Sequence, residues 1–315
     1  MSKTIMKKIF KATLSTVVMA SSIALVPVSA QAAEVCAQDI SYISDRGHES
    51  RERSLSVLQA GFKAGAAKDF KAFMAIASDS YVQHSPDLAD GWEPVWGLLT
   101  NRPEGFSSKT KTWLGPHGFL DNGSFLVMFR EVNRGDGTGP SKIVDLMRFD
   151  SDGKYSEHWD IRQALSEKTV SGHSETEAHT QFTDNPVNYT QKEEEANKKT
   201  VTNFLNMAFN GGEIDQALEK YVHEDYVQHN PLIADGKAAV SAAFASGKMP
   251  SLCYDIKYVV SQNDLVVAYS KVTSDQGISA VADILRVRDG KLVEHWDVIE
   301  SVPADEDMPH TNGMF

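Results

Sequence analysis

Two short phrases occur twice in the sequence, and this repeat limits how the chain can fold. Tyr-Val-Gln-His-Ser-Pro at 81–86 returns as Tyr-Val-Gln-His-Asn-Pro at 226–231, and Glu-His-Trp-Asp occurs at 157–160 and 294–297. The copies are offset by 145 residues at the first phrase and by 137 at the second, a difference that surface loops absorb easily. Because this period is far longer than a solenoid repeat, the pattern predicts a tandem duplication of one domain.

The length of the chain also fits a duplication. A sequence of 315 residues with 41% apolar and 23% charged residues is long enough for two globular domains, each with its own core. We expect a signal peptide at 1–32, a first domain at 50–165 and a second at 193–302. Residues 166–192 are rich in Ser, Thr, Glu and His and are predicted to be a linker, and 303–315 a C-terminal tail.

The N-terminal segment has the pattern of a secretory signal. Four lysines precede an apolar run over residues 12–28, and Ala30-Gln31-Ala32 supplies small residues for cleavage. A transmembrane anchor is the alternative, but the run is short and rich in serine for that role. The pattern therefore predicts a soluble protein that is periplasmic or secreted.

Charge and cysteine content limit the partners. The formal net charge is −12 and becomes −16 when the four lysines of the signal are removed. An acidic surface without a basic run argues against nucleic acid and against an anionic membrane as partners of the mature protein. Export permits a disulfide between Cys36 and Cys253, with two free thiols as the alternative.

Each half predicts the same order of elements, helices followed by strands. In the second half, apolar residues recur at helical spacing from Val201 to Phe209 and from Ile214 to Val222, and a small-residue helix is expected over 238–245. Strands are expected at 254–261, 265–273, 278–287 and 291–298. The first half repeats this order, with helices near 52–62 and 70–77 and strands within 118–132, 141–149 and 155–163. The fold class is therefore α+β, with helices on one side of a sheet.

The repeated strands carry aspartates among apolar neighbours. Alternation puts Asp283 on one face with Val281 and Leu285, and Asp145 is placed in the same way. A carboxylate in apolar surroundings either finds a hydrogen-bond partner or has a raised pKa, and a carboxyl with a raised pKa can donate a proton near neutral pH. A purely structural aspartate, satisfied by its neighbours, is the alternative.

Histidines complete the candidate set. His295 and Asp297 share a face of the last strand, as do His158 and Asp160, about 7 Å apart along the backbone. Each pair either points into one cavity or holds neighbouring strands. His84 and His229 precede turns, where a histidine is either a general base or a structural donor.

Other chemistries have weaker support in the sequence. Two histidines and one carboxylate could form a metal site in each half, as His84, Asp145 and His158 or as His229, Asp283 and His295. The sequence has no short metal-ligand spacing, no glycine-rich phosphate loop and no nucleophile turn. We therefore expect neither a cofactor nor a metal.

The helices, the Tyr-Val-x-His-x-Pro phrase, the Asp-x-x-Arg strand and the Glu-His-Trp-Asp strand together resemble one family. It is the SnoaL-like, polyketide cyclase-like branch of the nuclear transport factor 2-like superfamily, and the resemblance covers both halves. It implies two cone-shaped α+β barrels, each a curved antiparallel sheet around about three helices with a deep apolar pocket. Because members of this family often pair through their sheets, it also implies a pseudo-dimer within the chain or a homo-oligomer.

The resemblance to ketosteroid isomerases within this superfamily implies roles for single residues. By this analogy His84 and His229 take the place of the general base, and Asp145 and Asp283 that of the acid in the pocket. The same register turns the pairs His158–Asp160 and His295–Asp297 towards the pocket. The tyrosine that completes the oxyanion hole in those enzymes falls near Ala60 and Leu205, which cannot donate a hydrogen bond.

Two functions follow from these patterns and stay open at this point. The first is cofactor-independent acid–base catalysis on a small carbonyl compound, by aldol-type cyclisation, isomerisation or dehydration. The second is non-catalytic binding of a small apolar ligand, or of a protein partner, through the same surfaces.

Overall fold

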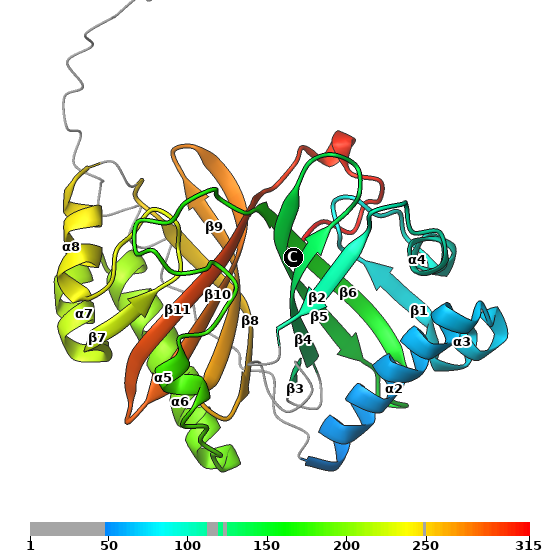
Figure 1. The fold of residues 1–315 in the computed structure, drawn as a ribbon, viewed down its shortest axis with the longest axis horizontal. Helices are drawn as coiled ribbons and strands as arrows, with labels where there is room; N and C mark the ends of the chain where they lie inside the picture. Colours follow the sequence, from blue (N-terminus) through cyan, green and yellow to red (C-terminus); the bar gives the residue numbers. More distant parts are fainter. Residues whose placement is uncertain (1–47, 112–118, 122–124, 248–249) are drawn as a thin grey trace, which may run out of the picture.

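The computed structural model describes residues 48–111, 119–121, 125–247 and 250–315. It consists of two α+β halves whose sheets face each other, with the helices on the outer sides (Figure 1). This confirms the predicted fold class. The predicted signal peptide and Cys36 lie outside the described residues. Among the described helices, none has the length and apolar character needed to cross a membrane.

The elements follow the predicted order of helices and then strands, except that one strand precedes the last helix of each half. Those of the first half are α2 (His48–Ala67), α3 (Phe70–Ile76), β1 (Ala77–Gln83), α4 (Trp92–Thr100), β2 (Ser107–Thr110), β3 (Phe119–Asp121), β4 (Phe125–Asn133), β5 (Pro140–Phe149) and β6 (Tyr155–Ala164). A short helix, α5 (Thr180–Thr183), lies between the halves. Those of the second half are α6 (Gln191–Leu205), a π-helical turn (Asn206–Asn210), α7 (Ile214–Tyr221), β7 (Val222–Gln228), α8 (Lys237–Ala245), β8 (Cys253–Gln262), β9 (Leu265–Ser274), β10 (Gly277–Arg288) and β11 (Lys291–Ser301). A 3₁₀ turn (Asp305–Asp307) follows.

Both sheets are mixed, which corrects the expectation of an antiparallel sheet. Within the described residues the strand orders are β1-β6-β5-β4-β2, with β3 beside β4, and β7-β11-β10-β9-β8. The successive strands are antiparallel, but β1 pairs in parallel with β6, and β7 with β11. The Tyr-Val-Gln phrase is thus itself a strand. Its parallel register places Gln83 beside His158 and Gln228 beside His295.

Each half buries its helices against one face of its own sheet. In the second half, Val201, Leu205 and Ala217 from the helices pack with Val281 and Leu285 from β10, all nearly inaccessible to solvent. The helical spacing of the first three and the strand alternation of the last two account for this packing. The face between helices and sheet is therefore the one that carries Asp283.

The other faces of the two sheets pack against each other. Trp159 and Trp296, from the repeated Glu-His-Trp-Asp phrase, lie in this shared core and are 0% exposed. A buried tryptophan removes on the order of 200 Å² from water, worth about 5 kcal/mol. The sheet–sheet core therefore contributes strongly to holding the halves together.

The segment after the last strand of each half runs across the other half. The segment after β6 contacts the second half, and the segment after β11 contacts the first half. We call residues 165–183 the first strap and residues 302–315 the second strap. The Ser174 carbonyl of the first strap accepts a hydrogen bond from His229 Nδ1 at 2.6 Å, and the Gly313 carbonyl of the second accepts one from His84 Nδ1 at 2.7 Å. The segment predicted as a linker therefore packs on the second half.

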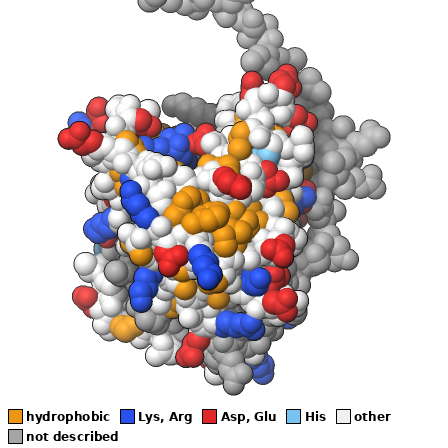
Figure 2. Space-filling view, turned by 90° about the vertical axis from the view of Figure 1, so that its right-hand side faces the viewer, with side chains coloured by type: hydrophobic (Ala, Val, Ile, Leu, Met, Phe, Trp, Pro, Cys, Tyr) orange, Lys and Arg blue, Asp and Glu red, His pale blue; other side chains and the backbone are white. Residues whose placement is uncertain are grey.

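Two surface features complete the fold. Figure 2 shows apolar side chains gathered on the outer, helical side of the first half, where the exposed ones include Phe62, Phe70 and Leu98. Cys253, at the start of β8, is disulfide-bonded. The sequence contains one other cysteine, Cys36.

Candidate functional site

The second half places an aspartate, a histidine and a glutamine in one chain of contacts. Asp283 lies on the helix-facing side of β10 and is 4% exposed. Its Oδ1 lies 3.0 Å from Nε2 of His295 on β11. Nδ1 of the same histidine lies 2.9 Å from Oε1 of Gln228 on β7. The chain of contacts therefore crosses three neighbouring strands and ends in the core.

Backbone contacts fix the orientation of the Gln228 amide. Its Oε1 accepts the backbone N–H of Asn230 at 2.9 Å, so the amide oxygen, not the NH₂ group, faces the histidine. His295 therefore carries a proton on Nδ1 and donates it to Gln228. One further proton lies in the hydrogen bond between His295 Nε2 and Asp283.

The surroundings of Asp283 favour its protonated form. Burial raises the pKa of Asp283, and the nearby Asp297 adds to the rise while His295 opposes it. Its other oxygen, Oδ2, is buried and has no hydrogen-bond partner among the described residues. Leaving such an oxygen unpaired costs on the order of 1–3 kcal/mol, which a ligand donor at this position would recover. Burial also raises the pKa of the neighbouring Tyr254 well above its usual value, so that hydroxyl keeps its proton.

Asp297 lies directly opposite Asp283 in the β10–β11 ladder. Its surroundings favour the ionised form of the carboxyl, whereas those of Asp283 favour the protonated form. Nζ of Lys142, which belongs to the first half, lies 3.3 Å from Asp297 Oδ1, and Asn230 donates its amide N–H to the other oxygen. Burial alone would raise the pKa of Asp297, but Lys142, His295 and Asn230 together hold it below the usual value. Asp297 is therefore the ionised carboxyl of this site.

The first half repeats the same chain of contacts. His158 Nδ1 lies 3.0 Å from Gln83 Oε1, and His158 Nε2 lies 3.3 Å from Asp145 Oδ1. Backbone N–H groups of His84 and Ser85 donate to Gln83 Oε1 and orient its amide in the same way. The duplicated phrases therefore encode duplicated Gln–His–Asp chains.

The charges of the two carboxyls are reversed in the first half. Arg130 holds both oxygens of Asp145 at 2.7 Å, and although burial acts in the other direction, Arg130 and His158 lower the pKa of Asp145. Burial raises the pKa of Asp160, with the Asp145 charge adding to the rise against opposition from His158 and Ser85. Here the central-strand aspartate is ionised, and the last-strand aspartate retains its proton more readily.

Two differences between the halves account for this reversal. By the register of the strand ladders, Arg130 corresponds to Ser270, and Lys142 corresponds to Ala280. Ser270 is buried, and its hydroxyl has no hydrogen-bond partner among the described residues. Both cations thus come from the first half. Arg130 contacts Asp145 in the site of its own half, whereas Lys142 contacts Asp297 in the site of the second half.

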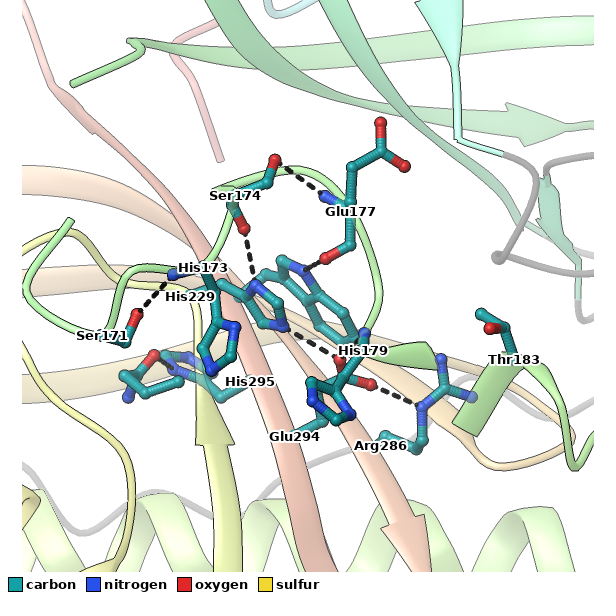
Figure 3. Close-up of polar contacts among 12 residues, drawn as sticks. Ser171, His173, Ser174, Glu177, His179, Thr183, His229, Arg286, Glu294 and His295 are labelled. Atoms are coloured by element: carbon teal, nitrogen blue, oxygen red, sulfur yellow. Dashed lines mark hydrogen bonds and ion pairs between the residues drawn. The ribbon is translucent and has the colours of Figure 1, made fainter. Parts of the chain in front are cut away.

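The structure corrects the predicted position of His229. It lies on the opposite face of the sheet from Asp283, stacked on Trp296 with ring centroids 4.6 Å apart (Figure 3). Its Nε2 lies 2.9 Å from Glu294 Oε1, and its Nδ1 from the Ser174 carbonyl as described above. Because Gln228 and His229 are successive residues of the chain, they face opposite sides.

His84 is placed in the same way in the first half. It stacks on Trp159 with ring centroids 4.6 Å apart, and its Nε2 lies 2.9 Å from Glu157 Oε1. In each half, a glutamine therefore stands beside the Asp–His contact at the place where the resemblance implied a histidine base. The other residues implied to face one pocket do meet in part, since Asp145 contacts His158 and Asp283 contacts His295.

A metal can be tested against the same residues. Asp145, His158 and Asp160 offer ligand atoms within 4.8 Å of one another. However, Arg130 already occupies both oxygens of Asp145 and supplies the positive charge there. The predicted metal sets are not brought together, because His84 and its counterpart in the second half face away.

Sequence reasoning missed residues of two kinds. Gln83 and Gln228 alternate with His84 and His229 inside the repeated phrase, so strand alternation could have separated them. Lys142 carried no signal, because it meets a residue 155 positions away across the contact between the halves.

Comparison with known proteins agrees with this architecture. The profile of the SnoaL-like domain family matches residues 201–295. Residues 201–295 form a SnoaL-like domain. This confirms the predicted family for the second half, whereas membership of the first half stays a prediction from its repeated phrases. No curated protein matches the sequence significantly.

Several solved structures are similar to part of the chain. TsrD from Streptomyces laurentii is 21% identical, covers 33% of this chain and 89% of its own, and has a TM-score of 0.30. IdmH, a putative polyketide cyclase from Streptomyces antibioticus, is 21% identical over 33% of this chain and 91% of its own, with a TM-score of 0.29. A putative ketosteroid isomerase from Kribbella flavida is 13% identical over 36% of this chain and 87% of its own, with a TM-score of 0.30.

Proposed function

We propose that each half binds a small carbonyl compound and that the second half moves a proton beside the carbonyl without a cofactor. Aldol-type cyclisation, isomerisation and dehydration all require this step. One observation carries the proposal. Asp283 Oδ1 lies 3.0 Å from His295 Nε2 in a buried site, and the remaining carboxyl oxygen of Asp283 is buried without a hydrogen-bond partner among the described residues.

Asp283 and His295 together account for every proton that moves in the proposed step. When the shared proton lies on His295 Nε2, Asp283 is a carboxylate whose Oδ2 accepts a proton from the carbon beside the carbonyl. The enolate oxygen that develops then takes a hydrogen bond from the protonated Tyr254 hydroxyl. Asp283 returns the proton to another carbon of the substrate, which completes an isomerisation. A raised pKa suits Asp283 to this exchange, because acid and base strengths then match near neutral pH.

The roles of the other predicted residues follow from their contacts. Asp297 and Asp160 are proposed to set the charge of their sites. In the first half, the Arg130 guanidinium neutralises Asp145, so we propose that this site binds its ligand through a different charge pattern. His84 and His229 have structural roles in this scheme.

A simple ketone tests the proposal. Conversion of cyclohex-3-en-1-one to its conjugated isomer requires proton removal and return, and it can be followed by ultraviolet absorbance. Asp283→Asn removes the base while keeping the shape of the side chain. We expect a loss in kcat of about 100-fold or more, the usual contribution of a positioned acid–base group.

The matched control is Asp145→Asn, which changes the corresponding residue of the first half. It should leave most of the turnover, because the proposed reaction belongs to the second site. Unchanged turnover in Asp283→Asn would contradict the proposal. Wild-type protein that binds the ketone without converting it would favour the non-catalytic alternative.

We further propose that the protein is exported. The N-terminal pattern and the disulfide at Cys253 support this, because disulfides persist in oxidising compartments. Mass spectrometry of the protein from the extracytoplasmic fraction should find a mature chain that begins near residue 33. An uncleaved N-terminus would contradict the proposal.

A further inference from the structure

One lysine of the first half is buried in the second site. Lys142 lies on β5 and is 0% exposed. Its Nζ lies 2.8 Å from Glu175 Oε2 in the first strap and 3.3 Å from Asp297 Oδ1 on β11. The sheet–sheet contact therefore completes the second site with a charge that its own sequence lacks.

Lys142 differs from the other buried lysine of this region because one of its partners is a carboxyl of the second site. A buried ammonium must be paired, since its desolvation costs several kcal/mol. Lys142 lies between two carboxyls, of which Glu175 belongs to the strap and Asp297 to the site. The first half contains a comparison for this residue. Lys111 is also buried and also lies between two carboxylates, Glu177 of the first strap at 2.8 Å and Glu131 at 3.1 Å, but neither belongs to the second site.

We propose that Lys142 is a positioning residue of the second site, which keeps Asp297 ionised and thereby leaves the mobile proton to the Asp283–His295 pair. This rests on the proposed function, because the protonation of the pair matters only if the pair transfers a proton. It also explains why the duplicated sites differ, since the corresponding residue Ala280 offers no charge to Asp160.

The groups around Asp297 determine what happens without the lysine. Besides Lys142, it faces the carboxyl of Asp283, the imidazole of His295 and the amide of Asn230, with the Glu175 carboxylate beyond the lysine. Without the ammonium, two carboxyls that face each other in the ladder compete for protons, and like charges disfavour the double anion. Asp297 then takes up a proton at higher pH, and Asp283 ionises more easily.

The test compares Lys142→Met with the control Lys111→Met. Both substitutions remove a buried ammonium that contacts the first strap, but only the first removes one that contacts the site. Carboxyl groups labelled with ¹³C on aspartate are titrated by NMR, a measurement that does not depend on turnover. Lys142→Met should raise the titration midpoint of Asp297 by about one unit or more. Lys111→Met should leave it unchanged, and Lys142→Arg, which keeps the charge, should preserve most of the wild-type midpoint.

A second variant addresses folding. Lys142→Met leaves Glu175 buried without its partner, so Lys142→Met with Glu175→Gln removes both charges of the strap contact and should fold more stably. The midpoint of Asp297 should rise in this double variant as well. An Asp297 midpoint that stays at the wild-type value in either folded variant would overturn the proposal.

The pH profile separates this proposal from the proposed function. In the wild type, kcat/KM for cyclohex-3-en-1-one follows the protonation of the Asp283–His295 pair. The pH at which kcat/KM falls on the acid side of the profile should shift in Lys142→Met and stay unchanged in Lys111→Met. Absence of turnover in the wild type would contradict the proposed function, while the carboxyl titration would still decide the role of Lys142.

Discussion

At the scale of single residues, the position of His229 changes the interpretation of the repeated phrase. Its ring covers Trp296, one nitrogen faces a strap carbonyl and the other faces Glu294, so no nitrogen remains for a substrate. Glu294 also accepts a hydrogen bond from Arg286 Nε at 2.9 Å. His229 therefore links the strap to the sheet, and the proton chemistry belongs to the other face.

His229→Phe tests this structural role. The substitution keeps the stacking on Trp296 and removes the hydrogen bonds to Glu294 and Ser174. Because one of these bonds involves a charged partner, the free energy of unfolding should fall by about 2–3 kcal/mol in urea denaturation. The pH midpoints of turnover should not move. A variant with wild-type stability and strongly reduced kcat would instead restore His229 as the base.

Some of these residues were predictable from the sequence and others were not. Strand alternation grouped His295 with Asp297, and the family resemblance turned this pair towards Asp283, which it contacts in the structure. Alternation also predicts that Gln228 and His229 diverge. The charge of Asp283 was not predictable, because it depends on burial and on the neighbouring Asp297. The contact of Lys142 with that residue depends on how the two sheets pack.

At the scale of elements, the helices and the antiparallel strands follow from apolar spacing. The predicted helix from Ile214 to Val222 is α7, Ile214–Tyr221, and the last predicted strand is β11. The strands β1 and β7 were not predicted, because each ends three residues before a proline, in a segment whose sequence is typical of a turn. Their parallel pairing is nevertheless the feature that places each glutamine beside its histidine.

The second strap gives a prediction at this scale. Deletion of residues 308–315 removes the Gly313 carbonyl that faces His84, the Met314 carbonyl that accepts from Tyr269 at 2.8 Å, and the buried Met314 side chain. About 2 kcal/mol for the side chain and about 1 kcal/mol for each hydrogen bond predict a loss of roughly 3–5 kcal/mol.

Hydrogen exchange locates this effect. Amides of β1 should lose protection in the deletion variant, because Asn312 and the Gly313 carbonyl of the strap contact Gln83 and His84, whereas amides of α7 and β7, at the outer side of the second half, should change less. Equal loss of protection in both halves would show that the strap stabilises the whole molecule and not the first half in particular.

At the scale of the whole molecule, β6 and β11 contact each other through two nearly equivalent hydrogen bonds, each from a backbone N–H of one strand to a side chain of the other. Gln163 accepts the backbone N–H of Ile299 at 3.1 Å, and Glu300 accepts that of Arg162 at 2.9 Å. The two side chains occupy corresponding positions in the halves, but one is neutral and the other can ionise. This contact between the halves is therefore sensitive to pH.

Glu300 gives the direction of that sensitivity. Burial, with the charges of Asp160 and Asp87, raises the pKa of Glu300 from 4.5 to about 7, against the opposing hydrogen bond from Arg162. The folded chain thus keeps a proton that the unfolded chain releases at lower pH. The free energy of unfolding should therefore fall as pH rises from about 4.5 to about 7, and stay level above that.

Glu300→Gln mimics the protonated form and copies the residue found in the first half. The variant should lose this part of the pH dependence and be more stable than the wild type at pH 8 by about 1–3 kcal/mol. Urea denaturation at pH 5 and pH 8 measures both effects. A variant that is destabilised equally at both pH values would contradict the account.

The two sites of the molecule share a framework but differ in charge. Each has a Gln–His–Asp chain from three neighbouring strands, which duplication explains. The cations that separate them, Arg130 and Lys142, both lie in the first half. Packing of the halves thus turns one repeated site into two chemically different ones.

Titration of the four site carboxyls in the wild-type protein tests this central claim most directly. With aspartate labelled by ¹³C at the carboxyl carbon, NMR should show Asp145 and Asp297 ionising below the usual pH range and Asp160 and Asp283 above it. Corresponding residues of the two halves would then titrate in opposite order. Equal midpoints for Asp145 and Asp283, or for Asp160 and Asp297, would contradict the account.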